Sequence, residues 1–263
     1  MRVPDFQKLF LSASTAQLGA QVTLLALPLV AILGLHASAV QVGLLAALGT
    51  LPYLLVGLPA GAWLERARLK RVLSFSALGR ALVLGSVPLL WAFHEVDMGV
   101  LYAIAAVVGL MSTFYDIAWQ SYLPSLVGTS RLHEASSRLT IASSGAQLFG
   151  PGLAGFLVRA LSAPLALLAD AIGFVVAAIS VQTIEATDPL PADRPDEAGV
   201  ARRVAEGLSY VARHELLCWI AVGTGAWNCV AVASVLATAL SELRLLSDPP
   251  EKLRPGAVTL RQA

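Results

Sequence analysis

Seven apolar segments, each long enough to cross a lipid bilayer, constrain the fold of this chain more than any other feature. A helix rises about 1.5 Å per residue, so about 20 apolar residues span about 30 Å of hydrocarbon. None of the segments alternates polar and apolar residues as a strand would, and a backbone in lipid must satisfy its own hydrogen bonds. The sequence therefore predicts an all-α membrane protein. The segments are residues 10–35, 40–64, 72–93, 98–120, 139–161, 164–184 and 216–240.

Composition supports this class and argues against several others. The chain is 57% hydrophobic and 13% charged, whereas a soluble domain carries about 25% charged residues. It has no Gly-x-x-x-x-Gly-Lys phosphate loop, no Cys/His cluster of a metal site and no Ser–His pair within the apolar segments. We therefore expect no cofactor, no metal and no enzymatic activity. The lipid bilayer is the expected partner, and nucleic acid is not.

The placement of positive charge predicts the orientation. The N-terminus, the 65–71 turn, the 121–138 loop and the 185–215 linker carry twelve Lys and Arg residues together, and the alternate loops at 36–39, 94–97 and 162–163 carry none. Cytoplasmic loops are enriched in Lys and Arg. We therefore expect a multi-pass protein of the cell membrane with a cytoplasmic N-terminus. The first segment is too long for the core of a cleaved signal peptide.

The segments group into four regions. Residues 1–184 are expected to form a six-helix bundle, and residues 216–240 a seventh transmembrane helix. The 185–215 linker is rich in Pro and Asp and ends in an amphipathic pattern at 200–216, which fits a helix on the cytoplasmic face or a solvated linker helix. Residues 241–263 are too polar to span a membrane and are expected to be disordered.

The turn between the second and third segments suggests a family. It begins at Gly61 and places Glu65, Arg66, Lys70 and Arg71 within a few residues of one another. It resembles the signature loop of the major facilitator superfamily of secondary transporters, Gly-x-x-x-Asp-Arg-x-Gly-Arg-Arg/Lys. Glu65 replaces the Asp of that pattern, and one base is lost. In the family, this loop forms a charge latch with neighbouring helices that favours the outward-facing state.

The fifth segment carries a second resemblance. Ala142, Ala146, Gly150, Pro151 and Gly155 are similar to the antiporter motif of the superfamily, Gly-x-x-x-Gly-x-x-x-Gly-Pro-x-x-Gly-Gly. Small residues at every fourth position allow close helix approach, and ordinary packing explains that spacing equally well. The second segment has a comparable Gly/Pro interruption at 57–61, which suggests two three-helix repeats of inverted topology.

Residues 116–124 and 170–174 look like the branch that contains enterobactin exporters and macrolide-efflux-like permeases. The resemblance covers residues 5 to about 235. Family members have twelve helices, with the transport path between two six-helix halves, so the chain is expected to be a truncated member. The fourth segment lacks the Arg of the proton-linked motif of the superfamily, so proton coupling does not follow from the resemblance.

Charged residues within the segments are the first candidates for a site, because each is costly in lipid. Arg80 and Asp116 lie at similar depth, so we expect them to approach each other, or Asp116 to meet Arg66 or Arg71. They form either a latch or a static ion pair. Asp170 either faces a cavity or is a packing partner. The proposed latch comprises Gly61, Glu65, Arg66, Lys70, Arg71, Arg80 and Asp116.

Buried amides are the other candidates. The resemblance implies a cavity lined by the first, fourth, fifth and seventh helices, among others. The candidates for substrate contact are Gln17, Gln21, Gln147, Asp170 and Asn228. Hydrogen bonds between helices explain any single amide at least as well.

Three functions fit the sequence. The first is a secondary transporter that exports drugs, siderophores or similar small molecules. The second is a non-transporting remnant, or an accessory subunit that acts as a homodimer or with a partner that supplies a second half. The third, a membrane-embedded enzyme, has least support.

Overall fold

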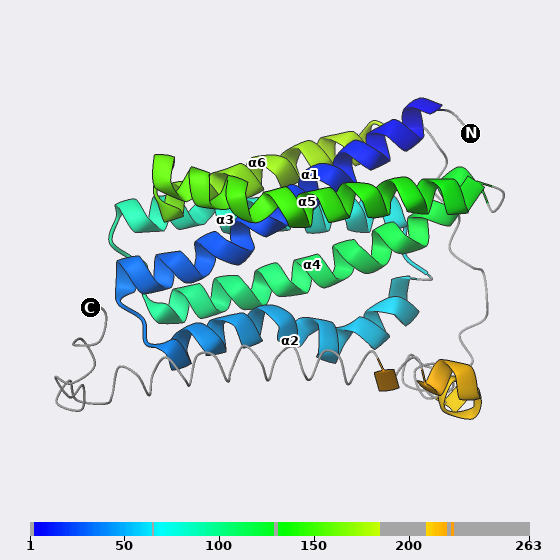
Figure 1. The fold of residues 1–263 in the computed structure, drawn as a ribbon, viewed down its shortest axis with the longest axis horizontal. Coiled ribbons are helices and arrows are strands. Elements are labelled where there is room, and N and C mark those ends of the chain that lie inside the picture. The colour runs from blue at the N-terminus through cyan, green and yellow to red at the C-terminus, as the bar shows by residue number, and fades with distance from the viewer. Residues whose placement is uncertain (1–2, 65, 129–130, 185–208, 220–221, 224–263) are drawn as a thin grey trace, which may run out of the picture. The chain divides into compact units, whose positions relative to one another are not determined.

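The computed structural model describes residues 3–64, 66–128, 131–184, 209–219 and 222–223 (Figure 1). The described part is all-α, as predicted. Six of its helical segments are long and apolar enough to cross a membrane. They are α1 (Val3–Leu29, continued by the π-helical η1, Val30–Gly34), α2 (Ala39–Leu64), α3 (Leu69–Ala92), α4 (Met98–Val127), α5 (Leu132–Leu161) and α6 (Ala163–Gln182).

The chain divides into two units, residues 1–206 and 207–263. In the second unit, residues 209–213 and 215–219 are helical, and the backbone N–H of Cys218 donates to the His214 carbonyl at 2.9 Å. Most of the predicted linker and seventh helix, and all of the predicted tail at 241–263, lie outside the described residues. The same holds for Glu65 and Asn228.

The helices are longer than their apolar segments at one connection. A loop is predicted at 121–138, but α4 continues to Val127 and α5 begins at Leu132. That prediction is wrong because a helix does not end where its apolar residues end. Polar side chains can extend a helix beyond the hydrocarbon, where water and lipid headgroups solvate them. At the opposite end of α4, Asp97 caps the helix by accepting from the backbone N–H of Val100 at 2.7 Å.

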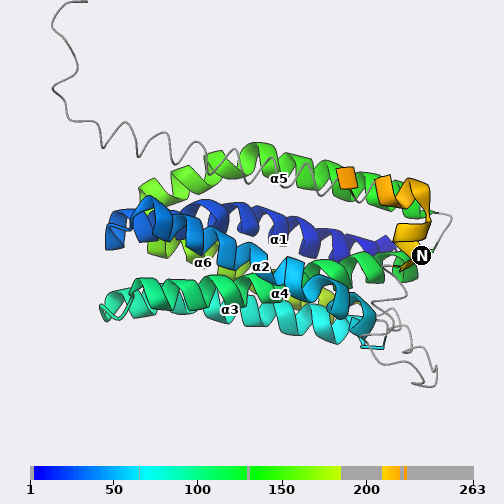
Figure 2. The same cartoon turned by 90° about the horizontal axis from the view of Figure 1, so that it is seen from below.

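The packing of the six helices has an internal symmetry (Figures 1 and 2). Helix α1 packs against α5 and α6, α4 packs against α2 and α3, and α3 packs against α6. Exchanging α1–α3 with α4–α6 leaves this set of pairs unchanged. Consecutive helices run in opposite directions, so α4 is antiparallel to α1. The arrangement therefore matches the inverted three-helix repeats suggested by the Gly/Pro interruptions in α2 and α5.

The contact between α2 and α4 depends on a pair of glycines. A Cβ atom on Gly109 would lie 2.2 Å from the carbonyl oxygen and 2.9 Å from the carbonyl carbon of Gly49. Such a distance leaves no room for a side chain, and backbone atoms cannot move aside as a flexible side chain can. Small residues bring membrane helices into close contact where no hydrophobic effect drives them together.

Buried apolar side chains form two separate clusters along the bundle. One cluster lies toward the end that contains residues 66–68 and includes Leu73, Tyr122 and Phe174. The other lies toward the opposite end and includes Leu84 and Leu101. The buried polar residues Thr23, Arg80 and Asp170 belong to neither cluster, and they form the first part of the site.

Candidate functional site

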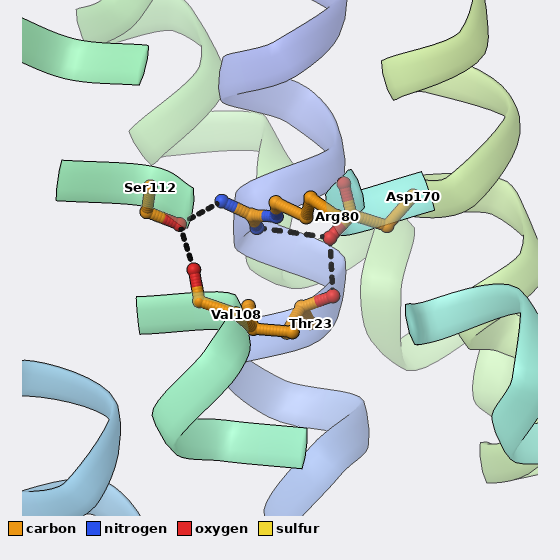
Figure 3. A network of polar contacts seen from close by, with 5 residues as sticks. All are labelled: Thr23, Arg80, Val108, Ser112 and Asp170. Atoms are coloured by element: carbon orange, nitrogen blue, oxygen red, sulfur yellow. Dashed lines mark hydrogen bonds and ion pairs between the residues drawn. The ribbon is translucent and has the colours of Figure 1, made fainter. Parts of the chain in front are cut away.

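A buried ion pair joins α3 to α6 (Figure 3). Arg80 Nη2 lies 3.0 Å from Asp170 Oδ2, and the two side chains are 8% and 0% exposed. The Thr23 hydroxyl on α1 donates to the same carboxylate oxygen. Arg80 lies at the middle of α3, and Asp170 lies in the middle third of α6. Both charges therefore lie well inside the helices, where an unpaired charge is most costly.

The second terminal nitrogen of the Arg80 guanidinium contacts α4. Its Nη1 donates to the Ser112 hydroxyl at 2.6 Å, and that hydroxyl donates to the Val108 carbonyl at 2.7 Å (Figure 3). The guanidinium carbon lies 4.2 Å from the centre of the Phe174 ring, a cation–π contact. One arginine thus links α3 to both α4 and α6.

A second set of contacts extends from Phe174. Tyr115 packs edge-on against this ring, with 5.7 Å between ring centres and 81° between planes. The Tyr115 hydroxyl lies 2.9 Å from that of Ser12, which donates to the Ala177 carbonyl at 3.1 Å. We call this connected set of residues on α1, α3, α4 and α6 the charge network. It consists of Ser12, Thr23, Arg80, Ser112, Tyr115, Asp170 and Phe174.

The backbone of α1 lies close to α6 beside the charge network. A Cβ atom on Gly19 would lie 2.0 Å from Asp170 Oδ1, so a larger residue would collide with the carboxylate. A Cβ on Gly173 would lie 3.2 Å from the Thr15 carbonyl oxygen. Asp170 Oδ1 and Arg80 Nε make no hydrogen bond within the described residues. The carboxylate is therefore held through its other oxygen, Oδ2.

The expected pair between Arg80 and Asp116 is not formed, and that prediction is wrong. Arg80 pairs with Asp170, and it meets α4 at Ser112, one helical turn before Asp116. Position along a segment gives the depth of a residue in the membrane but not the direction in which its side chain points. Asp116 is partly exposed and makes no hydrogen bond or ion pair within the described part of the chain. The expected contacts of Asp116 with Arg66 or Arg71 are therefore not made either.

The 61–71 region is held by contacts other than the predicted contacts with Asp116. Lys70 Nζ donates to the carbonyl of Ile184 at 2.6 Å, which ties the start of α3 to the residues that follow α6. The backbone N–H of Arg66 donates to the Trp63 carbonyl at 3.1 Å. Gly61 is partly buried, nothing lies within 4 Å of the position that a Cβ on it would take, and Arg71 is exposed. The latch itself remains a prediction.

The small residues of α5 do permit close packing. Ala146, Gly150 and Ala154 are buried along one face, and a Cβ on Gly150 would lie 2.5 Å from the Gln21 Cβ. Pro151 and Gly155 are exposed. Gly150 therefore sets the distance between α5 and α1, whereas the antiporter role of the motif remains a prediction.

A cavity of about 410 Å³ opens between α1, α4 and α5. Gln17 lines it together with hydroxyl groups from α5, the Trp119 ring and the Gln120 amide from α4. None of its lining residues is charged. A largely apolar concave surface with a few polar groups is typical of small-molecule sites.

The other described residues that were predicted to contact substrate lie outside this cavity. Gln21 packs against Gly150, Gln147 is exposed, and neither lines this cavity. Asp170 is fully buried in the charge network, so of its two predicted roles the structure supports the packing partner.

Sequence reasoning did not identify the cavity hydroxyls or the partners of Arg80. Ser136, Thr140 and Ser143 recur at helical spacing, and this polar stripe was a usable signal for a cavity wall. Thr23 and Ser112 carry no comparable signal, because single hydroxyl residues are common in membrane helices and usually bond to their own backbone.

A model of the Major Facilitator Superfamily matches residues 9–247. The chain belongs to this superfamily. It is 28% identical over 251 residues to the uncharacterized MFS-type transporter YfiS of Bacillus subtilis (strain 168), covering 93% of this chain and 58% of that protein. It is 30% identical over 212 residues to the multidrug efflux pump Tap of Mycolicibacterium fortuitum, covering 76% of this chain and 50% of Tap.

The chain thus spans about half the length of the curated relatives it matches. Within the major facilitator superfamily, its six described helices correspond to the all-α, multi-pass architecture expected of one half of the fold. Membership places the protein in a family of membrane transporters rather than of enzymes.

Proposed function

We propose that this major facilitator protein exports small molecules, with the cavity between α1, α4 and α5 as one wall of the transport path. The observation that carries the proposal is the cavity itself, with an uncharged lining of aliphatic side chains, amides, hydroxyls and one tryptophan. Such a lining favours amphipathic solutes that combine a ring with hydrogen-bonding groups. Similarity to a multidrug efflux pump supports export over import.

The proposal includes a second six-helix unit facing this wall. Transporters of this architecture alternate access by rocking one repeat bundle against another around a fixed site. Another six-helix unit, for example from a second copy of this chain, would supply the opposite wall. The molar mass of the purified protein in detergent, measured by light scattering, distinguishes a dimer or complex from a monomer.

We also propose a cytoplasmic N-terminus in the cell membrane and membership of the enterobactin-exporter-like and macrolide-efflux-like branch. The one-sided distribution of Lys and Arg supports the orientation. The residues at 116–124 and 170–174 support the branch. A reporter enzyme that is active only in the cytoplasm, fused at the N-terminus and in turn at residue 95, tests the orientation.

Replacing Gln17 with Leu is expected to weaken export. The amide lines the cavity, and losing one hydrogen bond to a bound solute costs about 1 kcal/mol, or about a fivefold loss of apparent affinity. The measurement is ethidium efflux from cells that lack their major efflux pumps, with antibiotic susceptibility as a second readout.

Gln7→Leu is the matched control, because Gln7 lies on the same helix but is exposed and outside the cavity. It should leave efflux unchanged. If the wild-type chain at full expression exports neither ethidium nor any antibiotic in the panel, the proposed function is wrong. If Gln7→Leu and Gln17→Leu act equally, the cavity is not the path.

A further inference from the structure

A second, apolar groove of about 710 Å³ lies between α2, α3 and α4. Helices α2 and α3 both pack on α4 but make almost no contact with each other, and α4 lies between them in Figure 1. Val56 and Trp63 of α2, Phe75 of α3 and Phe114 of α4 form its walls. The groove shares no lining residue with the cavity between α1, α4 and α5.

One end of the groove lies beside the basic turn. Trp63, 51% exposed, packs edge-on against Phe114 with 5.9 Å between ring centres. Tryptophan is enriched at membrane–water interfaces. Arg71 also lines the groove; its side chain is exposed and makes no hydrogen bond or ion pair in the described part of the chain. In the proposed orientation this end faces the cytoplasmic leaflet.

We propose that this groove binds one anionic phospholipid of that leaflet, with an acyl chain along the apolar walls and the phosphate on Arg71. Anionic headgroups are attracted to basic residues next to a membrane helix. An arginine guanidinium can bind phosphate through two parallel hydrogen bonds. The apolar walls match the acyl chain of such a lipid, and Arg71, which has no partner among the described residues, matches its phosphate.

The positive charge of Arg71 argues against a protein helix as the occupant of the groove. A helix from a second copy would cover Arg71 and leave a desolvated charge without a partner, unless it supplied a carboxylate at that point. A lipid phosphate neutralises the charge and leaves the headgroup in water. The lipid is therefore the better fit to both ends of the groove.

Fluorescence quenching by brominated lipid tests the proposal. The full chain is reconstituted in phosphatidylcholine nanodiscs that contain equal mole fractions of either brominated phosphatidylglycerol or brominated phosphatidylcholine. The difference between the wild type and Trp63→Phe isolates the Trp63 signal. We expect brominated phosphatidylglycerol to quench Trp63 at about fivefold lower mole fraction than brominated phosphatidylcholine does, and Arg71→Gln to remove that preference.

Arg68→Gln is the matched control, because Arg68 is an exposed arginine of the same turn that does not line the groove. It should keep the preference. Val56→Phe narrows the groove and should reduce quenching by both lipids. Equal quenching by the two lipids in the wild type, or equal loss in Arg68→Gln and Arg71→Gln, would overturn the proposal. Absence of quenching by either lipid would also overturn the proposal, because no acyl chain would then lie beside Trp63. No readout here depends on transport.

Discussion

Replacing Arg80 with Met is expected to lower the free energy of unfolding by about 3–5 kcal/mol, because it leaves the Asp170 carboxylate buried without its cation. Asp170→Leu should cost a similar amount, since it strands the guanidinium between α3, α4 and α6. The measurement is unfolding of the purified protein in mixed micelles by increasing mole fractions of SDS, followed by circular dichroism.

The double variant Arg80→Met with Asp170→Leu separates the effect of the charges on the free energy of unfolding from the effect of side-chain packing. Apolar replacement of both members of a buried pair is often neutral or stabilising, so most of the lost stability should return. Arg159→Met is the control, because Arg159 is exposed on α5, and a surface change typically stays within about 0.5 kcal/mol. If Arg80→Met behaves like Arg159→Met, the charge network does not stabilise the bundle.

Replacing Gly109 with Ala is expected to be the second large effect, with a loss of about 1–3 kcal/mol. The new methyl group would meet the Gly49 backbone at 2.2 Å, so α2 must move away from α4. Helix propensity alone predicts the opposite sign, since Ala is favoured over Gly by about 1 kcal/mol in a helix. The same SDS titration measures the change.

Gly145→Ala is the matched control for that variant. Gly145 lies within α5, and nothing lies within 4 Å of the position a Cβ would take. This substitution should leave stability unchanged or raise it slightly. Equal stability of the two variants would mean that the bundle tolerates a wider α2–α4 spacing.

Hydropathy was sufficient to predict the long apolar helices in the described part of the chain. The six described helices that are long and apolar enough to cross the membrane appear where apolar segments predict them, because lipid forces every spanning segment to satisfy its own backbone. The ends of α4 and α5 were not predictable in this way. Polar side chains are compatible with helix continuation outside the hydrocarbon, so the hydropathy signal stops before the helix does.

The site was predictable in part. Gln17 was named from the amide pattern and lines the cavity, and Gly150 was named from the small-residue motif and sets the approach of α5 to α1. Arg80 and Asp170 were both recognised as costly charges, but not as partners of each other. They are 90 positions apart in the sequence, on helices whose contact no local pattern reports.

The sequence by itself determined that the chain crosses the membrane, how many described helices do so and which residues are too polar to be left in lipid. Those properties depend on transfer from water to hydrocarbon, which acts on each segment separately. Only the tertiary structure decided that Arg80 faces Asp170 rather than Asp116. It also decided that α2 and α3 pack on α4 but not on each other, which leaves a groove. Partner choice depends on the rotation of each helix about its axis, which is set by close contacts such as those of Gly19 with Asp170 and of Gly109 with Gly49.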